Sequence, residues 1–335
     1  MTIENLLNDL IADREIDLES LKQCFADFCD GVDYPPEQQA ALLVLLRARG
    51  ETPEQLAAIA DVFMQRAVNI EMPDAAVCLC GTGGDGAGTF NISTTASLLI
   101  AASGVAVAKH GSRSVTSKSG SADVLDELGI ATDLSPEKAI ASLQSHNFAF
   151  LFAQLYHPAF KHIAPIRTAV KVRTLFNILG PLLHPSNLKR QVIGVFDAAL
   201  LDTMANALAL AGHEKTLVVH SEDGLDEISM TGRTFARLVD HGKVSKLELT
   251  PEEFGFSRCS LEDLKGGSAS DNADILRSIF AGEQSSRADC VLFNAGVALW
   301  LAGTADSIGT GIEQAREVQQ SGKALNYIKG LGEVH

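Results

Sequence analysis

VCLCGTGGDGAGTFNISTTASLLIAASGVAVAKHG, residues 77–111, is the stretch that decides the fold class. It begins with apolar residues, places five glycines between Gly81 and Gly88, and then enters an apolar run headed by hydroxyl side chains. A second apolar segment follows and ends at Lys109. A strand, a glycine-rich turn, a helix and a second strand together make a βαβ unit, so the stretch predicts an α/β domain with a parallel sheet.

The segments that follow extend this pattern. Apolar strand candidates alternate with helix-like segments, and two further helices are expected near the end of the chain. The strand candidates are residues 76–80, 105–109, 148–152, 191–195 and 215–220. The helix candidates are residues 94–104, 121–129, 136–145, 198–211, 287–303 and 305–321. We therefore expect a central, largely parallel sheet flanked by helices.

The residues before about position 70 carry helical periodicity without strand signals. Pro36 and Pro53 stand at positions typical of helix starts, and Gly50 stands where a helix should end. Short helices with an apolar face need a partner to cover it. We expect a small N-terminal all-helical domain of residues 1–72, with part of the helical layer contributed by later residues, and a larger α/β domain of residues 73–335.

Composition and charge exclude several classes of protein. The 335 residues are 46% hydrophobic, enough to bury a large core. No apolar run reaches the roughly 18 residues that span a bilayer, and the first residues lack a signal-peptide pattern, so we expect a cytoplasmic protein without a membrane partner. The net charge of −15 disfavours nucleic-acid binding. Six scattered cysteines in mostly apolar surroundings indicate structural thiols.

The glycines of residues 81–86 match the dinucleotide-binding pattern G-x-G-x-x-G after a strand and before a helix. That site needs an acidic residue at the end of the second strand for the ribose hydroxyls, but Lys109 and His110 stand there. A nicotinamide site would therefore depend on Lys109 or Arg113 meeting an NADP phosphate. The P-loop pattern fails because no Gly-Lys-Ser/Thr follows the glycines.

A more general phosphate cradle remains. Glycines let a ligand approach the backbone closely, and a helix N-terminus offers free N–H groups and the positive end of its dipole. Asn91, Ser93 and Thr94 can add side-chain donors at that end. An ordinary capped turn is the alternative. A cap needs only one hydroxyl group, however, and four stand here, those of Ser93, Thr94, Thr95 and Ser97.

Two further polar clusters favour an anionic ligand. KHGSRSVTSKSGSADVLDELG, residues 109–129, mixes basic residues with serines and feeds a helix that should begin near Ser121. Consecutive parallel strands deliver their loops to one sheet edge, so this loop is expected beside the first. HSEDGLDEIS, residues 220–229, places Asp226 and Glu227 on a turn that we expect to face solvent. Mg²⁺ binds through a few carboxylates and substrate phosphate oxygens, so these residues are candidate metal ligands.

Six motifs, which follow one another along the chain in the same order as in a known family, together resemble that family. They are GTGGDG (81–86), NIST (91–94), KHG (109–111), KSGSADVL (118–125), RTLFNILGPL (173–182) and GLDEI (224–228). From about residue 20 to the C-terminus the chain resembles the anthranilate phosphoribosyltransferases of tryptophan biosynthesis, which have the nucleoside phosphorylase type of fold. The resemblance implies a homodimer formed through the helical part and Mg²⁺-dependent transfer of the phosphoribosyl group of phosphoribosyl pyrophosphate to anthranilate.

The resemblance also implies roles for individual residues. Phosphoribosyl pyrophosphate would be bound by Gly81, Thr82, Gly84, Asp85, Asn91, Ser93, Thr94, Lys109 and Ser121. The path or pocket of anthranilate would be lined by Gly81, His110, Ser112, His157, Arg167, Gly180 and Pro181. Magnesium would lie near Ser93, Asp226 and Glu227, and the catalytic residues would be Lys109, Asp226 and Glu227. The family usually has asparagine where this chain has Ser112, which puts the affinity for anthranilate in question.

Two other functions remain open from the sequence. A related phosphoribosyl or pentosyl transferase would use another aromatic acceptor, and a non-catalytic homologue would bind nucleic acid. The second function needs a basic face, which the net charge of −15 disfavours. A transition-metal site is also disfavoured, because His157 and His162 have no evident third ligand.

Overall fold

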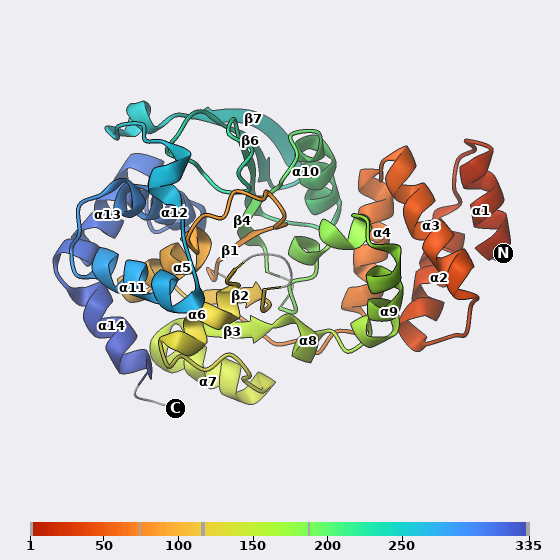
Figure 1. Cartoon of the computed structure of the whole chain (residues 1–335), viewed down its shortest axis with the longest axis horizontal. Coiled ribbons are helices and arrows are strands. Elements are labelled where there is room, and N and C mark those ends of the chain that lie inside the picture. Colours follow the sequence, from red (N-terminus) through yellow and green to blue (C-terminus); the bar gives the residue numbers. More distant parts are fainter. Residues whose placement is uncertain (1–2, 74, 115–117, 187, 333–335) are drawn as a thin grey trace.

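The computed structural model describes residues 3–73, 75–114, 118–186 and 188–332, and Figure 1 shows their arrangement. The chain begins with four helices, α1 (Ile3–Ile11), α2 (Leu18–Asp30), α3 (Pro36–Arg49) and α4 (Pro53–Met64). Helix α4 starts with a capping box, in which Thr52 and Gln55 satisfy each other's backbone N–H groups, and Gly31 ends α2 in the left-handed conformation. Both prolines expected at helix starts are therefore in place, at the first turns of α3 and α4.

A five-stranded sheet with the order β1-β4-β5-β6-β7 forms the centre of the rest of the chain. Strands β1 (Cys78–Gly81), β4 (Arg190–Gly194) and β5 (Lys215–Ser221) are parallel, and β6 (Thr234–Asp240) and β7 (Lys243–Leu249) continue the sheet in antiparallel fashion. The parallel pair β2 (Val107–Gly111) and β3 (Phe148–Phe152) joins β1 through Val77, whose backbone bonds to Ala106 and Ala108. All five predicted strands are confirmed, whereas the sequence analysis missed the β6–β7 hairpin.

Helices cover both faces of this sheet (Figure 1). Helices α5 (Ile92–Ser103), α12 (Ser286–Ala302) and α13 (Ile308–Gln320) pack together on one face, and α10 (Leu200–Leu210) packs with α4 on the other. The remaining helices are α6 (Ser121–Glu127), α7 (Pro136–His146), α8 (Ala153–Tyr156), α9 (Phe160–Val170), α11 (Ala269–Phe280) and α14 (Lys323–Gly332). The described residues also form the short 3-10 turns η1 (Leu175–Asn177), η2 (Gly180–Leu182), η3 (Pro251–Phe254) and η4 (Leu261–Leu264).

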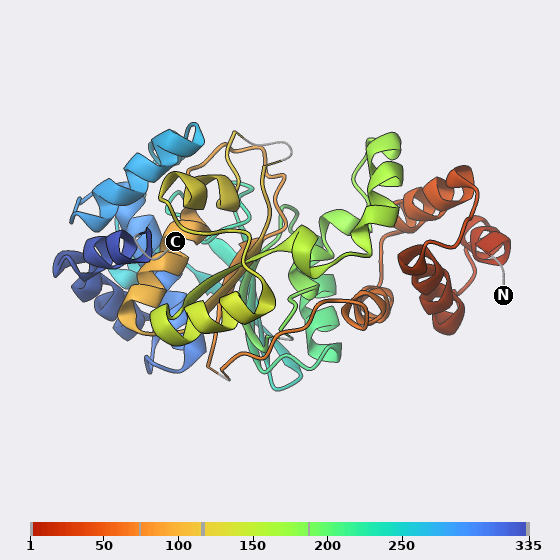
Figure 2. The same cartoon turned by 90° about the horizontal axis from the view of Figure 1, so that it is seen from below.

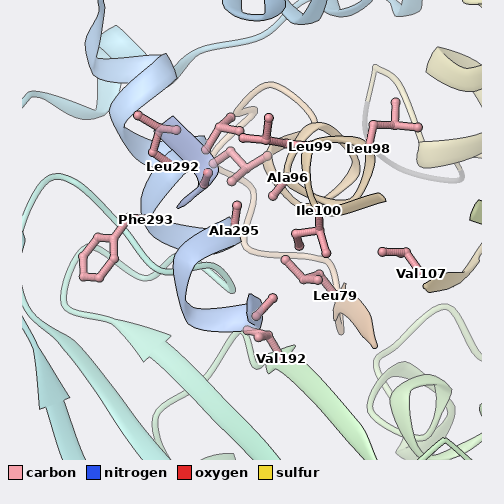
Figure 3. Packing of buried hydrophobic residues seen from close by; sticks show 14 of the residues in the cluster. Leu79, Ala96, Leu98, Leu99, Ile100, Val107, Val192, Leu292, Phe293 and Ala295 are labelled. Carbon is pink, nitrogen blue, oxygen red and sulfur yellow. The ribbon is translucent and has the colours of Figure 1, made fainter. Parts of the chain in front are cut away.

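The main apolar core lies between the sheet and α5 and α12 (Figure 3). Leu79 of β1 and Val192 of β4 point up at Ile100 of α5 and Ala295 of α12, and all four side chains are buried. Every residue of α5 from Thr94 to Ala102 is buried, so this helix is held rigidly behind the glycine-rich loop. The prediction of an α/β fold with a largely parallel, helix-flanked sheet is confirmed.

Later residues pack against the N-terminal helices. Helix α9 packs against α2 and α3 (Figure 2), and the rings of Phe63, Phe160 and Phe176 contact one another at centroid distances of 5.1 to 5.8 Å. Helix α4 also packs on α10, so a second core continues from the first helices into the α/β part. Within the described residues, no helix has both the length and the apolar character needed to cross a membrane.

One close contact positions the segment that carries the candidate metal ligands Asp226 and Glu227. At the ends of β1 and β4, Gly81 and Gly194 face the segment that carries Asp226. A Cβ on Gly194 would overlap the Asp226 backbone, and one on Gly81 would overlap the Asp226 carboxylate. These glycines therefore let the 224–227 segment lie directly against the strand ends.

We predict that Gly194→Ala lowers the free energy of unfolding by about 1–3 kcal/mol, because the new methyl group meets backbone that cannot move aside cheaply. Gly330→Ala is the matched control, since nothing lies within 4 Å of its added Cβ in helix α14. The control should gain roughly 0.5–1 kcal/mol. Urea unfolding measures both changes, and equal stability of the two variants would contradict the proposed close contact.

Candidate active site

Three polar segments meet at the carboxyl ends of the parallel strands. The glycine-rich loop follows β1, Lys109 and His110 lie at the end of β2, and Asp226 and Glu227 follow β5. In open α/β sheets, ligands bind outside this edge. The candidate site residues therefore lie at the edge of the sheet where open α/β folds bind their ligands.

Lys109 is fully buried, with 1% of its surface exposed. Its Nζ donates hydrogen bonds to the Leu79 carbonyl at 2.8 Å and to Ser93 Oγ at 3.3 Å. The ammonium group therefore links β1 with the N-terminus of α5.

Asp226 and Glu227 do not face solvent, which corrects the expectation from the sequence. Asp226 is 8% exposed and its Oδ2 accepts a bond from the Gly83 N–H at 2.6 Å. Glu227 is partly buried and its Oε1 accepts a bond from the Ser93 N–H at 3.2 Å. The turn packs onto Gly81 and Gly194, so its carboxylates point inward beneath the glycine-rich loop.

This burial changes the acidity of both carboxyl groups. It raises the pKa of Asp226 to about 7, and the nearby Asp85 carboxylate adds to the shift. It raises the pKa of Glu227 to about 8, with the Asp226 carboxylate as the next cause and Lys109 opposing. A bound cation would stabilise the charged forms of both groups.

The donor set fits a hard divalent cation such as Mg²⁺. Asp226, Glu227 and Ser93 supply only oxygen atoms, which Mg²⁺ prefers. Across the ranges that the structure describes, no group of three or more His, Cys, Asp or Glu side chains could hold a metal ion alone. Mg²⁺ usually takes one or two protein carboxylates and completes its shell with water and substrate oxygens.

The loop after β2 lies against α5, as the sequence predicts. Thr94 Oγ1 donates to Ser121 Oγ at 3.1 Å, and Asn91 Nδ2 donates to the Ser119 carbonyl at 3.4 Å. Helix α6 begins at Ser121, where the sequence analysis expected it. Residues 115–117 of the loop lie outside the described residues.

On the other side of β2, three histidine rings form a cluster. Lys109 and His110 are neighbours in a strand, so their side chains point to opposite faces. The ring of His110 lies 5.3 Å from that of His157 and 5.8 Å from that of His184. His157, 2% exposed, bonds through Nε2 to the Leu183 carbonyl, which directly follows the η2 turn that contains Gly180 and Pro181.

Two nitrogen atoms of this cluster are buried without a partner. In the described part of the chain, neither His110 Nε2 nor His157 Nδ1 has a hydrogen-bond partner. Burial lowers the pKa of His157 to about 4 and holds the pKa of His110 well below its usual value. Both rings are therefore neutral near pH 7 and offer hydrogen-bonding atoms to a ligand.

Arg167 and Ser112 lie further out. Arg167 is partly buried on α9 with its guanidinium 5.6 Å from the Phe176 ring centre, and burial lowers its pKa. Phe176 contacts Phe160, which contacts His157, so an aromatic row connects Arg167 to the histidine cluster. Ser112 is exposed and its hydroxyl donates to the Arg113 carbonyl, so the structure does not bring this side chain into the cluster.

The structure adds residues that the sequence analysis did not single out. Arg173 donates to the Gly84 carbonyl and lies 4.1 Å from the Phe196 ring centre, so it contacts the glycine-rich loop from outside. Arg173 opens the motif RTLFNILGPL, which could have drawn attention to it. Asn272 bonds to Asn91, and no signal in the sequence points to this pair because 181 positions separate them.

Comparison with known proteins identifies the relatives of this chain. A model described as "Glycosyl transferase family, a/b domain" matches residues 74–325, and one described as "Glycosyl transferase family, helical bundle domain" matches residues 4–67. The anthranilate phosphoribosyltransferase of Desulfitobacterium hafniense strain Y51 is 45% identical over 296 residues, which cover 88% of each chain. That of Chlorobium phaeobacteroides strain BS1 is 41% identical over 329 residues, 97% of this chain and 95% of its own.

Solved structures give the same result. The crystal structure of anthranilate phosphoribosyltransferase from Thermus thermophilus superposes with a TM-score of 0.90 at 39% identity and covers 98% of both chains. The enzyme from Saccharomyces cerevisiae in complex with PRPP (phosphoribosyl pyrophosphate) and Mg superposes with a TM-score of 0.89 at 25% identity. That match covers 99% of this chain and 97% of the yeast chain.

The buried, neutral His157 predicts a loss of stability in acid. Its pKa of about 4 in the folded protein lies below the ordinary 6.5, so the unfolded chain binds a proton more readily. The stability that the neutral ring gives to the folded protein is fully present above pH 6.5 and is lost as the pH falls toward 4. The free energy of unfolding should therefore fall by about 2 kcal/mol between pH 7 and pH 5. His157→Gln, which can still donate to Leu183, should reduce this slope in urea unfolding. The prediction is wrong if the two slopes agree.

Proposed function

The chain belongs to the anthranilate phosphoribosyltransferase family, and from this premise we propose that it transfers the phosphoribosyl group of phosphoribosyl pyrophosphate to the amine of anthranilate. One observation carries the proposal. Lys109 Nζ and Glu227 Oε1 both bond to Ser93, at the N-terminus of a rigid helix behind a five-glycine loop. A lysine, a carboxylate and the positive end of a helix dipole at one point suit a magnesium-bound pyrophosphate.

The donor site would use the loop and the start of α5. We assign phosphoribosyl pyrophosphate binding to the residues that surround Ser93 and Lys109 at this end of the sheet. They are Gly81, Thr82, Gly84, Asp85, Asn91, Ser93, Thr94, Lys109 and Ser121. Backbone amides in this loop can approach the phosphates closely, because Gly83, Gly84 and Gly86 have positive φ angles and no side chains.

Ser93, Asp226 and Glu227 would hold Mg²⁺. When bound, the ion neutralises charge on the pyrophosphate group as it leaves. The raised pKa values of both carboxyl groups support this assignment, because a buried pair of acids needs a cation to stay ionised. Lys109 adds a fixed positive charge beside Ser93.

Anthranilate would occupy the histidine side of β2. The unpartnered His110 Nε2 and His157 Nδ1 offer contacts to its polar groups, and Gly81, Gly180 and Pro181 shape the path. Arg167, at the end of the aromatic row, offers a guanidinium fork for the carboxylate. Donor and acceptor would then meet at the end of β2, on either side of the Lys109–His110 backbone.

The chemistry needs positioning and charge stabilisation more than a strong nucleophile. The bond from ribose C1 to the pyrophosphate oxygen breaks, the amine nitrogen of anthranilate bonds to C1, and this nitrogen then loses one proton to solvent water or to the departing pyrophosphate. Negative charge grows on pyrophosphate, where Lys109 and the backbone dipoles of α5 stabilise it. Anthranilate's amine is already neutral at pH 7, so the chain need not supply a dedicated base.

We also propose that the protein works in the cytoplasm and forms a homodimer through its helical part. The six cysteines are free thiols, as a reducing compartment allows. Ile11 at the end of α1 is 71% exposed and Val44 in the middle of α3 is 40% exposed. Apolar side chains on these two contacting helices offer a surface that a second copy can cover.

A related transferase that uses another aromatic acceptor is the second candidate. The observation that favours it is Ser112, which stands where the family has asparagine and whose hydroxyl bonds to its own loop. An acceptor that forms no hydrogen bond with the asparagine of the family would lose no affinity when serine stands at this position. A screen of aromatic amines against anthranilate separates the two candidates.

The central test follows anthranilate fluorescence after addition of phosphoribosyl pyrophosphate and Mg²⁺. We expect the signal to fall with wild-type protein and to persist with the double variant Asp226→Asn, Glu227→Gln, which loses most Mg²⁺-dependent turnover while keeping its fold. Asp240→Asn with Glu248→Gln makes the same change on the exposed face of the hairpin and should keep full activity. Near wild-type turnover of the site variant at low Mg²⁺ would rule out its metal role.

Ser112→Asn should improve the use of anthranilate. An asparagine amide is longer than the serine hydroxyl and offers more hydrogen-bonding atoms, so it can restore a contact to the acceptor. One neutral hydrogen bond is worth about 0.5–1.5 kcal/mol, so the KM for anthranilate should fall roughly two- to tenfold. The KM for phosphoribosyl pyrophosphate should stay unchanged. Poorer use of anthranilate by this variant would show a pocket built around serine.

A further inference from the structure

Asn272 lies in the first turn of α11 and is 3% exposed. Its Nδ2 donates to Asn91 Oδ1 at 2.8 Å, and its Oδ1 accepts from the Gly267 N–H at 2.9 Å. Asn91 is the N-cap residue of α5, at the proposed donor site. The pair therefore connects the C-terminal part of the chain directly to that site.

The segment before α11 supports the same loop through its backbone. The Phe90 N–H donates to the Leu264 carbonyl and the Gly266 N–H donates to the Gly88 carbonyl, both at 3.0 Å. Lys265 Nζ donates to the Ala87 carbonyl at 2.5 Å. Asn272 is thus fixed relative to the loop that it contacts.

These contacts determine which way both amides point. The Gly267 N–H can only donate, so it must face the Asn272 oxygen, and this turns the Asn272 NH₂ group toward Asn91. Asn91 must then present its oxygen to Asn272. Its own NH₂ group is left facing Ser119 in the loop after β2, on the donor side.

We propose that Asn272 is a positioning residue for the donor substrate: it orients the Asn91 amide so that one N–H of Asn91 donates to the Ser119 carbonyl and the other is presented to phosphoribosyl pyrophosphate. This inference rests on the proposed function. Without Asn272, the Asn91 amide could rotate by half a turn and present an oxygen to an anionic ligand. Asn272 itself touches no substrate.

Asn272→Asp tests this role with almost no change in shape. The aspartate still accepts from Gly267 and lies in the first turn of a helix, where negative charge is tolerated, but it cannot donate to Asn91. We expect the KM for phosphoribosyl pyrophosphate to rise about three- to tenfold and the KM for anthranilate to change less than twofold, while the unfolding midpoint falls because the new carboxylate is buried. Asn206→Asp, an exposed asparagine that donates to the Asp202 carbonyl, is the matched control and should leave all three unchanged.

A double-mutant cycle separates positioning from the field of the new charge. In an Asn91→Ala background, Asn272→Asp should raise the KM for phosphoribosyl pyrophosphate no further, because its target is gone. The neutral Asn272→Ala should behave likewise in both backgrounds and replaces the aspartate variant if that variant does not fold. An equal rise with and without Asn91 would overturn the inference.

The controls also separate this inference from the proposed function. An active wild type whose kinetic constants are unaltered by Asn272→Asp would mean that Asn272 only holds Gly267, which overturns the inference alone. A wild type that does not consume anthranilate with phosphoribosyl pyrophosphate and Mg²⁺ would overturn the proposed function itself.

Discussion

The contact between the 224–227 segment and the ends of β1 and β4 determines where the charges of the site lie. Gly81 and Gly194 carry no side chain, so the backbone and carboxylate of Asp226 occupy the space directly above the strand ends. From there Asp226 reaches the Gly83 N–H and Glu227 reaches the Ser93 N–H. A side chain at either glycine would push both carboxylates away from the glycine-rich loop.

This placement has an electrostatic cost that a ligand can offset. Buried acids are expensive in free energy unless they are paired, and the raised pKa values of Asp226 and Glu227 express that cost. Lys109 opposes it only in part. A site with these properties favours a divalent cation together with an anionic substrate. The cation neutralises the carboxylates, and the substrate places its negative charge near Lys109 and the α5 N-terminus.

Strand β2 separates the two halves of the proposed site, a donor half around Lys109 and an acceptor half around His110. Because side chains alternate along a strand, Lys109 points toward α5 and the donor loop while His110 points toward His157 and His184. The donor half is supported from behind by the start of α11. The acceptor half continues through Phe160 and Phe176 into the helical part, so movement of the helices would alter the acceptor half first.

The sequence by itself determined the fold class, the five parallel strands, the helix starts at Pro36 and Pro53, and the glycine-rich loop, because local periodicity and turn chemistry specify these features. It did not reveal the β6–β7 hairpin, since the polar residues of β7 on the sheet edge give a weak apolar pattern. Only the tertiary structure decided that Asp226 and Glu227 are buried, that His184 completes the histidine cluster, and that Asn272 contacts Asn91. The hydrogen bonds that hold these residues join positions 76 to 181 apart in the chain, which meet only when the sheet and its helices have formed. A residue's neighbours along the chain do not specify such contacts.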